Sequence, residues 1–168
     1  MRDLVNCTLE TQRLIIEPVS SAHADEAWEG LRDPRLWTHF PDLAPKTLDD
    51  LKMRYARWAS PGAGSESGEI WANWVCRKKT TGKLVGALQA TIHAPQSAYV
   101  AYMIYANDQR KGYAKEAMTA LVAHLRDRLH LRRLYAEIAP GNSASIRLIQ
   151  ALGFTPAAGL DSTWRLLL

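Results

Sequence analysis

Cysteine is scarce in this sequence, and residues with metal-ligand spacing are missing. Only two of the 168 residues are cysteine, Cys7 and Cys76, and they lie far apart. Small secreted domains held by disulfides contain many more, so this scarcity favours a reducing compartment, the cytoplasm. The five histidines are scattered along the chain without the spacing of metal ligands, and we assign no metal site.

Long apolar runs are also missing. No run approaches the ~20 residues that a membrane-spanning helix needs, and the N-terminal segment 1–6 lacks the apolar core of a signal peptide. Apolar residues make up 47% of the chain and charged residues 23%, a balance typical of soluble globular proteins. We therefore expect no membrane partner and a single domain over residues 1–168.

The chain has no tract of one charge and no familiar nucleotide-binding fingerprint. The formal net charge is +4 and the pI about 9.2, but no run of lysine and arginine predicts a nucleic-acid surface. A Walker loop and a Gly-x-Gly-x-x-Gly motif are both absent from the sequence. These absences disfavour nucleic acid as a partner and exclude two common ways of binding a nucleotide.

The most informative stretch runs from Tyr99 to Leu129. Aromatic and β-branched residues over 99–105 predict a strand, and Asn107-Asp108 predicts a turn. From Ala114 onward the apolar residues recur at helical spacing along one face. The stretch therefore predicts a strand, a short turn and a long amphipathic helix.

The turn before this helix combines features of an anion site. Backbone N–H groups at a helix N-terminus are unpaired and bind anions, and Gly112 permits a close approach to the backbone. Arg110, Lys111 and Lys115 add positive charge. An ordinary surface turn with solvated basic residues would look the same, so the turn alone leaves both interpretations open.

Three motifs resemble those of the GNAT superfamily of acetyl-CoA-dependent N-acetyltransferases. Residues 109–114, Gln-x-x-Gly-x-Ala after an apolar strand, are similar to the pyrophosphate loop of that family. Residues 11–14, Thr-x-Arg-Leu, resemble the opening of the branch that contains the ribosomal-protein N-terminal alanine and serine acetyltransferases. Residues 142–145, Asn-x-x-Ser, and 152–154, Leu-Gly-Phe, resemble that branch's closing signature. One such motif would be weak, but three in order cover nearly the whole chain.

The order of the predicted elements agrees with this resemblance. Apolar periodicity and turn residues give β-α-α-β-β-β-α-β-α-β-β. We therefore expect an α/β (α+β) fold, GNAT-like, with a mixed, mostly antiparallel central sheet of about seven strands flanked by about four helices. The predicted strands lie at 14–16, 70–77, 84–92, 99–105, 134–138, 155–160 and 163–168, and the helices at 20–31, 47–58, 114–129 and 143–152.

The resemblance implies acetyl-CoA as the cofactor and names residues that hold it. In the family the pantetheine arm inserts where two strands separate, which implies backbone contacts from Met103, Ile104 and Ala106. A backbone N–H near Ile104 would polarise the thioester carbonyl. Asn142 would cap the last helix, contact the cofactor, or do both. The implied pyrophosphate contacts are Gln109, Arg110, Lys111, Gly112, Tyr113, Ala114 and Lys115.

Acetyl transfer to an amine needs a base and a proton donor. Many family members place a base-like glutamate at the spacing of Glu137, five residues before Asn142. Ser145, in the first turn of the next helix, is the candidate donor to the departing sulfur and also a candidate cofactor contact. Glu69, at the start of a strand, is the second candidate base. A solvated strand carboxylate and a capping hydroxyl are the structural alternatives for Glu137 and Ser145.

The acceptor is expected to be a primary amine, either a protein N-terminal α-amine or a small-molecule amine. Trp37, His39, Phe40 and Trp71 are candidates for lining its pocket, although aromatic residues at such positions also serve as core. An α-amine with a pKa near 7.7–8.0 loses its proton more readily than a lysine near 10.4, so a single modest base suits an α-amine. The branch often dimerises, so a homodimer is an open alternative to a monomer.

Four positions depart from the family pattern. Glu17 stands where the branch often has arginine, Tyr99 where the central strand often has glutamate, and Ala101 where glycine is usual. Ile149 occupies the helix position where many GNAT enzymes place a tyrosine acid. The missing tyrosine leaves open a non-catalytic acyl-CoA-binding sensor or interaction module as the alternative to an enzyme.

Overall fold

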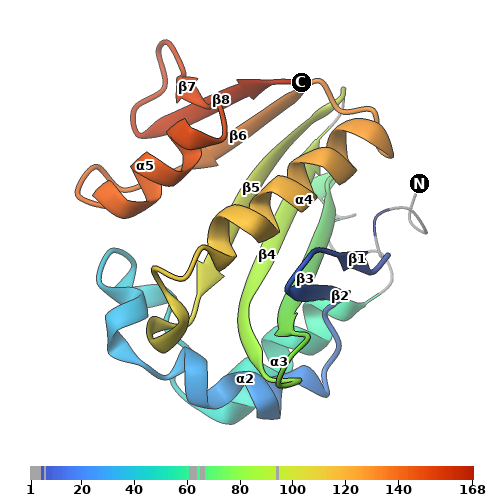
Figure 1. Ribbon diagram of the computed structural model, residues 1–168, viewed down its shortest axis with the longest axis vertical. Coiled ribbons are helices and arrows are strands. Elements are labelled where there is room, and N and C mark those ends of the chain that lie inside the picture. Colours follow the sequence, from blue (N-terminus) through green and yellow to red (C-terminus); the bar gives the residue numbers. More distant parts are fainter. Residues whose placement is uncertain (1–4, 6, 61–63, 65–66, 94) are drawn as a thin grey trace.

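The computed structural model describes residues 5, 7–60, 64, 67–93 and 95–168, and it is built on one eight-stranded sheet (Figure 1). The strand order is β1-β2-β3-β4-β5-β6-β8-β7, and every neighbouring pair is antiparallel except β5 and β6, which are parallel. The strands are β1 (Leu9–Glu10), β2 (Leu14–Pro18), β3 (Ile70–Lys78), β4 (Leu84–His93), β5 (Ser97–Ile104), β6 (Arg133–Glu137), β7 (Thr155–Pro156) and β8 (Thr163–Leu167). The α-helices are α2 (His23–Leu31), α3 (Leu48–Ala59), α4 (Tyr113–Asp127) and α5 (Ser143–Ala151), and the 3₁₀ turns are η1 (Pro34–Trp37), η2 (Pro41–Leu43) and η4 (Ala106–Asp108).

The helices cover the two faces of the sheet with separate cores. The larger core joins α4 and Ile149 of α5 to one set of alternating strand residues, including Trp74 and Val100. The smaller core joins α2 and α3 to the opposite set, including Val75 and Tyr105. Successive strand residues point to opposite faces, so β5 sends Val100 and Tyr102 toward α4 and α5 and sends Met103 toward the other face. Tyr105, the residue after the strand, packs on that other face as well.

The predicted fold class is confirmed, with small differences at both edges of the sheet. β1, a two-residue strand that pairs with β2, was not predicted. The strand predicted over 155–160 ends at Pro156, which lacks an N–H to continue the ladder. The predicted start of α3 at Thr47 is confirmed by a reciprocal capping box, in which Thr47 and Asp50 each accept the other's backbone N–H.

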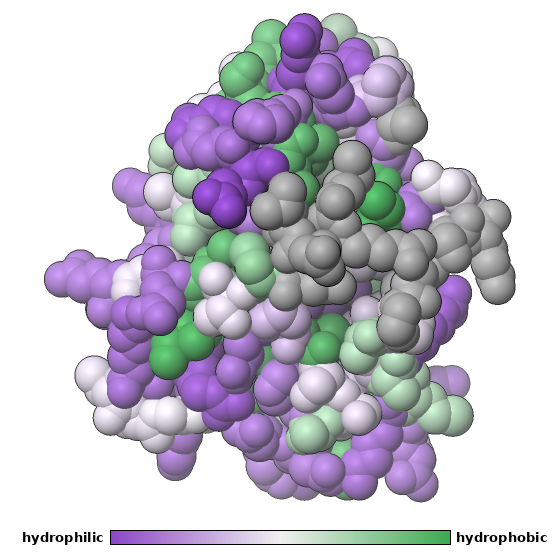
Figure 2. All heavy atoms as spheres, turned by 90° about the vertical axis from the view of Figure 1, so that its right-hand side faces the viewer, coloured by the Kyte–Doolittle hydropathy of each residue, from purple (hydrophilic) through white to green (hydrophobic). Residues whose placement is uncertain are grey.

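The surface near the N-terminal edge of the sheet is mostly hydrophilic. Seen from that side, apolar side chains gather only in small separate areas among the coloured residues (Figure 2). Among the described residues, no helix is long and apolar enough to cross a membrane. Cys76 is fully buried and Cys7 partly exposed, and these two described cysteines form no disulfide with each other.

Candidate active site

The two parallel strands in the middle of the sheet separate from each other. β5 and β6 pair at only three positions, ending at Tyr99 opposite Tyr135. Both strands continue beyond this pair, β5 as far as Ile104 and β6 as far as Glu137. Within the described part of the chain, the later half of β5 therefore has β4 on one side and no strand partner on the other, which opens a gap between β5 and β6 (Figure 1).

The backbone of β5 presents hydrogen-bonding groups to this gap. The N–H of Tyr105 donates to the carbonyl of Val85 at 2.8 Å, so Tyr105 and Met103 direct their backbone groups toward β4. Because this direction alternates, Tyr102 and Ile104 direct theirs toward the gap. The side-chain amide of Gln109 donates to the carbonyl of Ile104 at 3.0 Å, which agrees with that direction.

The loop between β5 and α4 ends on a glycine in a left-handed conformation. Gly112 has φ +82° and is the N-cap residue of α4, and no described side chain caps the helix there. The first N–H groups of α4 are therefore free to bind an anion. A Cβ on Gly112 would have one described heavy atom within 4 Å, Nη2 of Arg13 at 3.2 Å, so the space above this glycine is otherwise open. Arg110 also has a positive φ, +60°.

The basic residues of the loop differ in their surroundings. Lys111 turns back and donates to the carbonyl of Asn107 at 2.7 Å and to Asp108 Oδ1 at 3.1 Å. Arg110 and Lys115 are exposed. The predicted loop 109–115 is thus one continuous surface element, with uncapped backbone amides at the start of α4 and two exposed cations beside them.

The loop is anchored to the start of β2 by Arg13, Thr11 and Glu116. The Arg13 guanidinium contacts Glu116 Oε2 at 2.6 Å, donates to the carbonyl of Lys111 at 2.9 Å and lies 4.6 Å from the centre of the Tyr113 ring. Glu116 Oε1 also accepts the Thr11 hydroxyl at 2.5 Å and the Arg13 backbone N–H at 2.7 Å. Sequence reasoning did not predict this role, although Thr11 and Arg13 belong to a motif it had noted.

This anchor gives a test of stability. Burial opposes ionisation of Glu116, but the hydrogen bonds from Thr11 and Arg13 outweigh it and hold the pKa of the carboxyl below its usual value. A lowered pKa stabilises the fold above the unfolded-state pKa, and this contribution is lost as the pH falls through the folded-state pKa. We expect Glu116→Gln to lower the free energy of unfolding by about 2 kcal/mol at pH 7, and less below about pH 4.

Urea unfolding across this pH range measures the difference. The matched control is Glu29→Gln, because Glu29 pairs with Arg32 on the surface of α2, where its side chain is 72% exposed. Exposed pairs contribute little, so this variant should be near wild type. Equal stability losses in the two variants, or a loss for Glu116→Gln that does not change with pH, would contradict the anchoring role.

The candidate catalytic carboxylates lie at different places on the sheet. Glu137 is the exposed last residue of β6, beyond the final β5–β6 pair, and shares its face with Tyr135. Glu69 precedes β3 and accepts hydrogen bonds from Trp71 Nε1 at 2.8 Å and the Ser67 hydroxyl at 2.9 Å, which lower its pKa. Ile70, next to Glu69, pairs with Ile92 of β4, and Ile92 pairs with Ala98 of β5. Glu69 therefore lies beside the half of β5 that is still paired with β6. Glu137 therefore adjoins the gap, and Glu69 does not.

On the other face of the sheet, α5 begins beside the gap. Asn142 caps this helix by accepting the N–H of Ser145 at 3.1 Å, as predicted. Tyr102 of β5 packs against the core on this face, and the Ser145 hydroxyl is near enough to influence its pKa. Sequence reasoning did not select Tyr102, because an aromatic residue in a strand carries no signal beyond strand propensity.

These features have a counterpart among known proteins. The family description "Acetyltransferase (GNAT) domain" matches residues 13–155, most of the chain. The chain belongs to the GNAT acetyltransferase family. The sequence-based assignment of the family and of an N-acetyltransferase is therefore confirmed.

Individual relatives agree with the family. An uncharacterised N-acetyltransferase, p20 of Bacillus licheniformis, is 27% identical over 150 residues, which cover 88% of this chain and 82% of the relative. A GNAT-family acetyltransferase from Bacillus anthracis has the same fold, with a TM-score of 0.80 at 16% identity over 96% of this chain and 98% of that one. RimL, a ribosomal-protein α-N-acetyltransferase solved in complex with coenzyme A, gives 0.77 at 14% identity, with coverage of 96% and 98%.

The aromatic candidates for the acceptor pocket of this GNAT domain have different environments. Trp37 is buried, and its indole N–H donates to the carbonyl of Leu31 at 2.7 Å, so it packs in the smaller core. His39 and Phe40 are exposed, and a Cβ on Gly141 would lie 3.7 Å from the His39 ring. The α2–α3 connection therefore reaches the loop that follows β6. Trp71 is half-buried on the face of α2 and α3, under the guanidinium of Arg57 at 4.9 Å.

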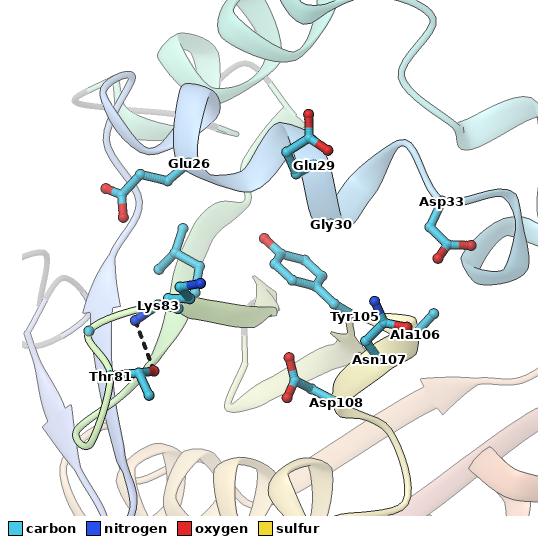
Figure 3. A pocket seen from close by; sticks show the side chains of 12 residues that line it. Glu26, Glu29, Gly30, Asp33, Thr81, Lys83, Tyr105, Ala106, Asn107 and Asp108 are labelled. Carbon is cyan, nitrogen blue, oxygen red and sulfur yellow. Dashed lines mark hydrogen bonds between the residues drawn. The ribbon is translucent and has the colours of Figure 1, made fainter.

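A separate hollow of about 550 Å³ lies on the β4 side of β5 (Figure 3). It is bounded by α2, the turn between β3 and β4, and η4, and its lining includes no residue of β6 or α5. Its carboxylates are paired with basic side chains: Glu26 with Arg77, Asp33 with Arg35, and Asp108 with Lys78 and Lys111. Tyr105 reaches into this region, where its ring lies against Gly30.

Proposed function

We propose that this GNAT enzyme transfers an acetyl group from acetyl-CoA to a primary amine by direct attack of the amine on the thioester. The observation that carries the proposal is the gap between β5 and β6, which lies beside a helix N-terminus that no described side chain caps. An extended ligand arm can pair with the free edge of β5, while its phosphates meet the N-terminus of α4. Acetyl-CoA fits both parts and supplies the activated acetyl group.

The residues proposed to hold acetyl-CoA fall into two groups. Ile104 and Ala106 line the path of the pantetheine arm with their backbones, whereas the backbone groups of Met103 point to β4, so the contact expected from Met103 is not kept. An N–H directed into the gap, at Ile104 or Tyr102, stabilises the oxygen that gains negative charge. Asn142 fixes the start of α5 at the side of the gap. The pyrophosphate meets the backbone and basic side chains of Gln109, Arg110, Lys111, Gly112, Tyr113, Ala114 and Lys115.

The acid and base roles lie on opposite faces of the sheet. Glu137 adjoins the gap on the face of α2 and α3, and we assign it the proton of the incoming ammonium. The proton for the leaving sulfur comes from the other face, along a path that includes Ser145 at the start of α5. The amine enters from one face, and the leaving thiol receives its proton from the other. The proton transfer to Glu137 and the proton transfer to sulfur therefore take place on different sides of the sheet. Glu69 is the alternative base, but its carboxylate already accepts two hydrogen bonds.

The proposed acceptor is a protein N-terminal α-amine or a small-molecule amine that approaches on the face of Glu137. His39 and Phe40 are exposed beside the loop after β6, and Trp71 lies on the same face of the sheet. Trp37 is buried and packs behind these acceptor-side residues in the smaller core. RimL acts on a ribosomal-protein α-amine, and its fold supports an α-amine as the first acceptor to test.

A thiol-release assay with acetyl-CoA tests the proposal. Peptides with free α-amines, peptides with only lysine amines, and polyamines are compared at neutral pH, and product mass identifies the acetylated nitrogen. We expect amine-dependent thiol release, fastest with an α-amine. Tight binding of acetyl-CoA without turnover on any amine would overturn the proposed reaction and favour a non-catalytic acyl-CoA-binding module.

A further inference from the structure

Tyr102 carries a buried hydroxyl that the roles assigned so far do not use. Its Oη is shielded from solvent, and no described group meets hydrogen-bond geometry with it, although the Ser145 hydroxyl lies close enough to act on its pKa. A buried hydroxyl without a partner is costly, because the water it bonds in the unfolded chain is not replaced. A group that arrives with a ligand would satisfy this hydroxyl, because Tyr102 lies on the half of β5 that lines the gap.

The phenol lies on the side of the sheet that α5 covers. Tyr102 packs against the same core as Ile149, which is fully buried on α5. Ser145 and Ile149 are four residues apart and share one helix face, so Ser145 also faces the sheet. Burial raises the pKa of Tyr102, while the nearby Ser145 hydroxyl lowers it, so the phenol keeps its proton at neutral pH.

We propose that Tyr102 is the proton donor to the leaving sulfur of coenzyme A, and that Ser145 returns a proton to it. In this chain the phenol comes from strand β5, and the residue that faces it from α5 is a serine one turn before Ile149. This inference rests on the proposed acetyl transfer and adds the acid that completes it. The unpartnered Oη then acquires its hydrogen bond when the sulfur occupies the gap.

The proposed step balances in atoms and charge. Glu137 first takes a proton from the incoming ammonium and releases it to solvent. The neutral amine nitrogen then forms its bond to the acetyl carbon and gives a second proton to Glu137. As the carbon–sulfur bond breaks, its electron pair stays on sulfur, and Tyr102 Oη supplies the proton that makes the free thiol. Ser145 passes a proton from solvent to the tyrosinate, and Glu137 releases its own to solvent. The net products are an amide and a thiol.

The first test is the rate of Tyr102→Phe. We expect kcat to fall about 100-fold, at the lower end for general acid catalysis because a thiolate is a moderate base, with KM for acetyl-CoA nearly unchanged. The thermal midpoint should not fall, since the change removes an unpartnered buried hydroxyl. Ser145→Ala added to Tyr102→Phe should cost little more than Tyr102→Phe alone, because the two groups serve one proton path.

The matched control is Tyr105→Phe. Tyr105 directly follows the same strand, is also buried and also has a hydroxyl without a partner among the described residues, but it points to the opposite face. This variant should keep the wild-type kcat. Equal rates for the two variants would remove Tyr102 from the reaction.

The second test needs only binding, so it separates this inference from the proposed function. The thiol of bound coenzyme A is titrated by the ultraviolet absorbance of its thiolate. A phenol that donates to sulfur stabilises the thiolate, so the pKa of the bound thiol should be about one unit higher in Tyr102→Phe than in wild type or Tyr105→Phe. An unchanged thiol pKa would overturn the role of Tyr102. A wild-type protein that binds coenzyme A but acetylates no amine would overturn the proposed function instead, and the titration would still decide the role of Tyr102.

Discussion

A Gly112→Asp protein is expected to fold and to lose binding of coenzyme A. Gly112 has φ +82°, a conformation that aspartate and asparagine tolerate better than other residues with a side chain. The new carboxylate would stand at the uncapped start of α4, where the pyrophosphate is proposed to bind. A pair of unit charges 4 Å apart interacts with about 4 kcal/mol at an effective dielectric of 20. Repulsion of this size corresponds to roughly a thousandfold increase in Kd.

Gly112→Asn is the matched control, because it adds nearly the same bulk without the charge. Both side chains would press on Nη2 of Arg13, 3.2 Å from the position of the new Cβ. Isothermal calorimetry with coenzyme A, beside thermal unfolding of each protein, separates loss of binding from loss of folding. Folded Asp and Asn variants of equal affinity would contradict the assignment of this loop to the pyrophosphate.

A Glu137→Gln protein is expected to lose most of its rate. General base catalysis is typically worth ~10²–10⁴-fold, and the glutamine keeps the size of the side chain at the exposed end of β6. The KM for acetyl-CoA should change little, because Glu137 adjoins the acceptor side of the gap. In this variant only amine that arrives neutral could react. The difference in rate between Glu137→Gln and wild type should therefore narrow as the pH rises toward the α-amine pKa of about 8.

Steady-state rates of wild type, Glu137→Gln and Glu69→Gln over pH 6 to 9 measure this effect. Glu69 is the competing candidate, and its carboxylate already accepts hydrogen bonds from Trp71 and Ser67. We expect Glu69→Gln to keep most of the wild-type rate. The opposite result, full activity without Glu137 and a large loss without Glu69, would transfer the base role to Glu69.

Much of the fold could be predicted from local chemistry. The helical spacing of apolar residues predicts α4, and the structure begins it at Tyr113, one residue before the predicted Ala114. The sequence also predicts the start of α3 at Thr47, where the structure shows a reciprocal cap between Thr47 and Asp50. The edges were less predictable, because β1 is only two residues long and exists through its pairing with β2. Periodicity has no signal at that length.

The candidate site was predictable in its loop but not in its supports. Gln109, Gly112 and Asn142 stand in motifs whose spacing is local, and the structure places Gly112 at the N-cap of α4 and Asn142 at that of α5. Arg13 and Glu116 are 103 residues apart and meet only because β2 and α4 pack together. Trp37 was predicted to line a pocket but lies in the core, where its indole N–H donates to the carbonyl of Leu31. The sequence alone cannot distinguish these two environments for an aromatic residue.

The sequence by itself determined the family, the order of the elements and the position of the candidate anion loop, because each depends on residues that are close in the chain. Only the tertiary structure decided that β5 and β6 stop pairing after Tyr99 and Tyr135, because strand separation depends on what packs on both faces. It also put Glu137 and Tyr102 on opposite faces of the gap, through the alternation of two different strands. The alternation of residues along a strand specifies to which face of the sheet each side chain points. The register between neighbouring strands then specifies which of these side chains lie next to each other.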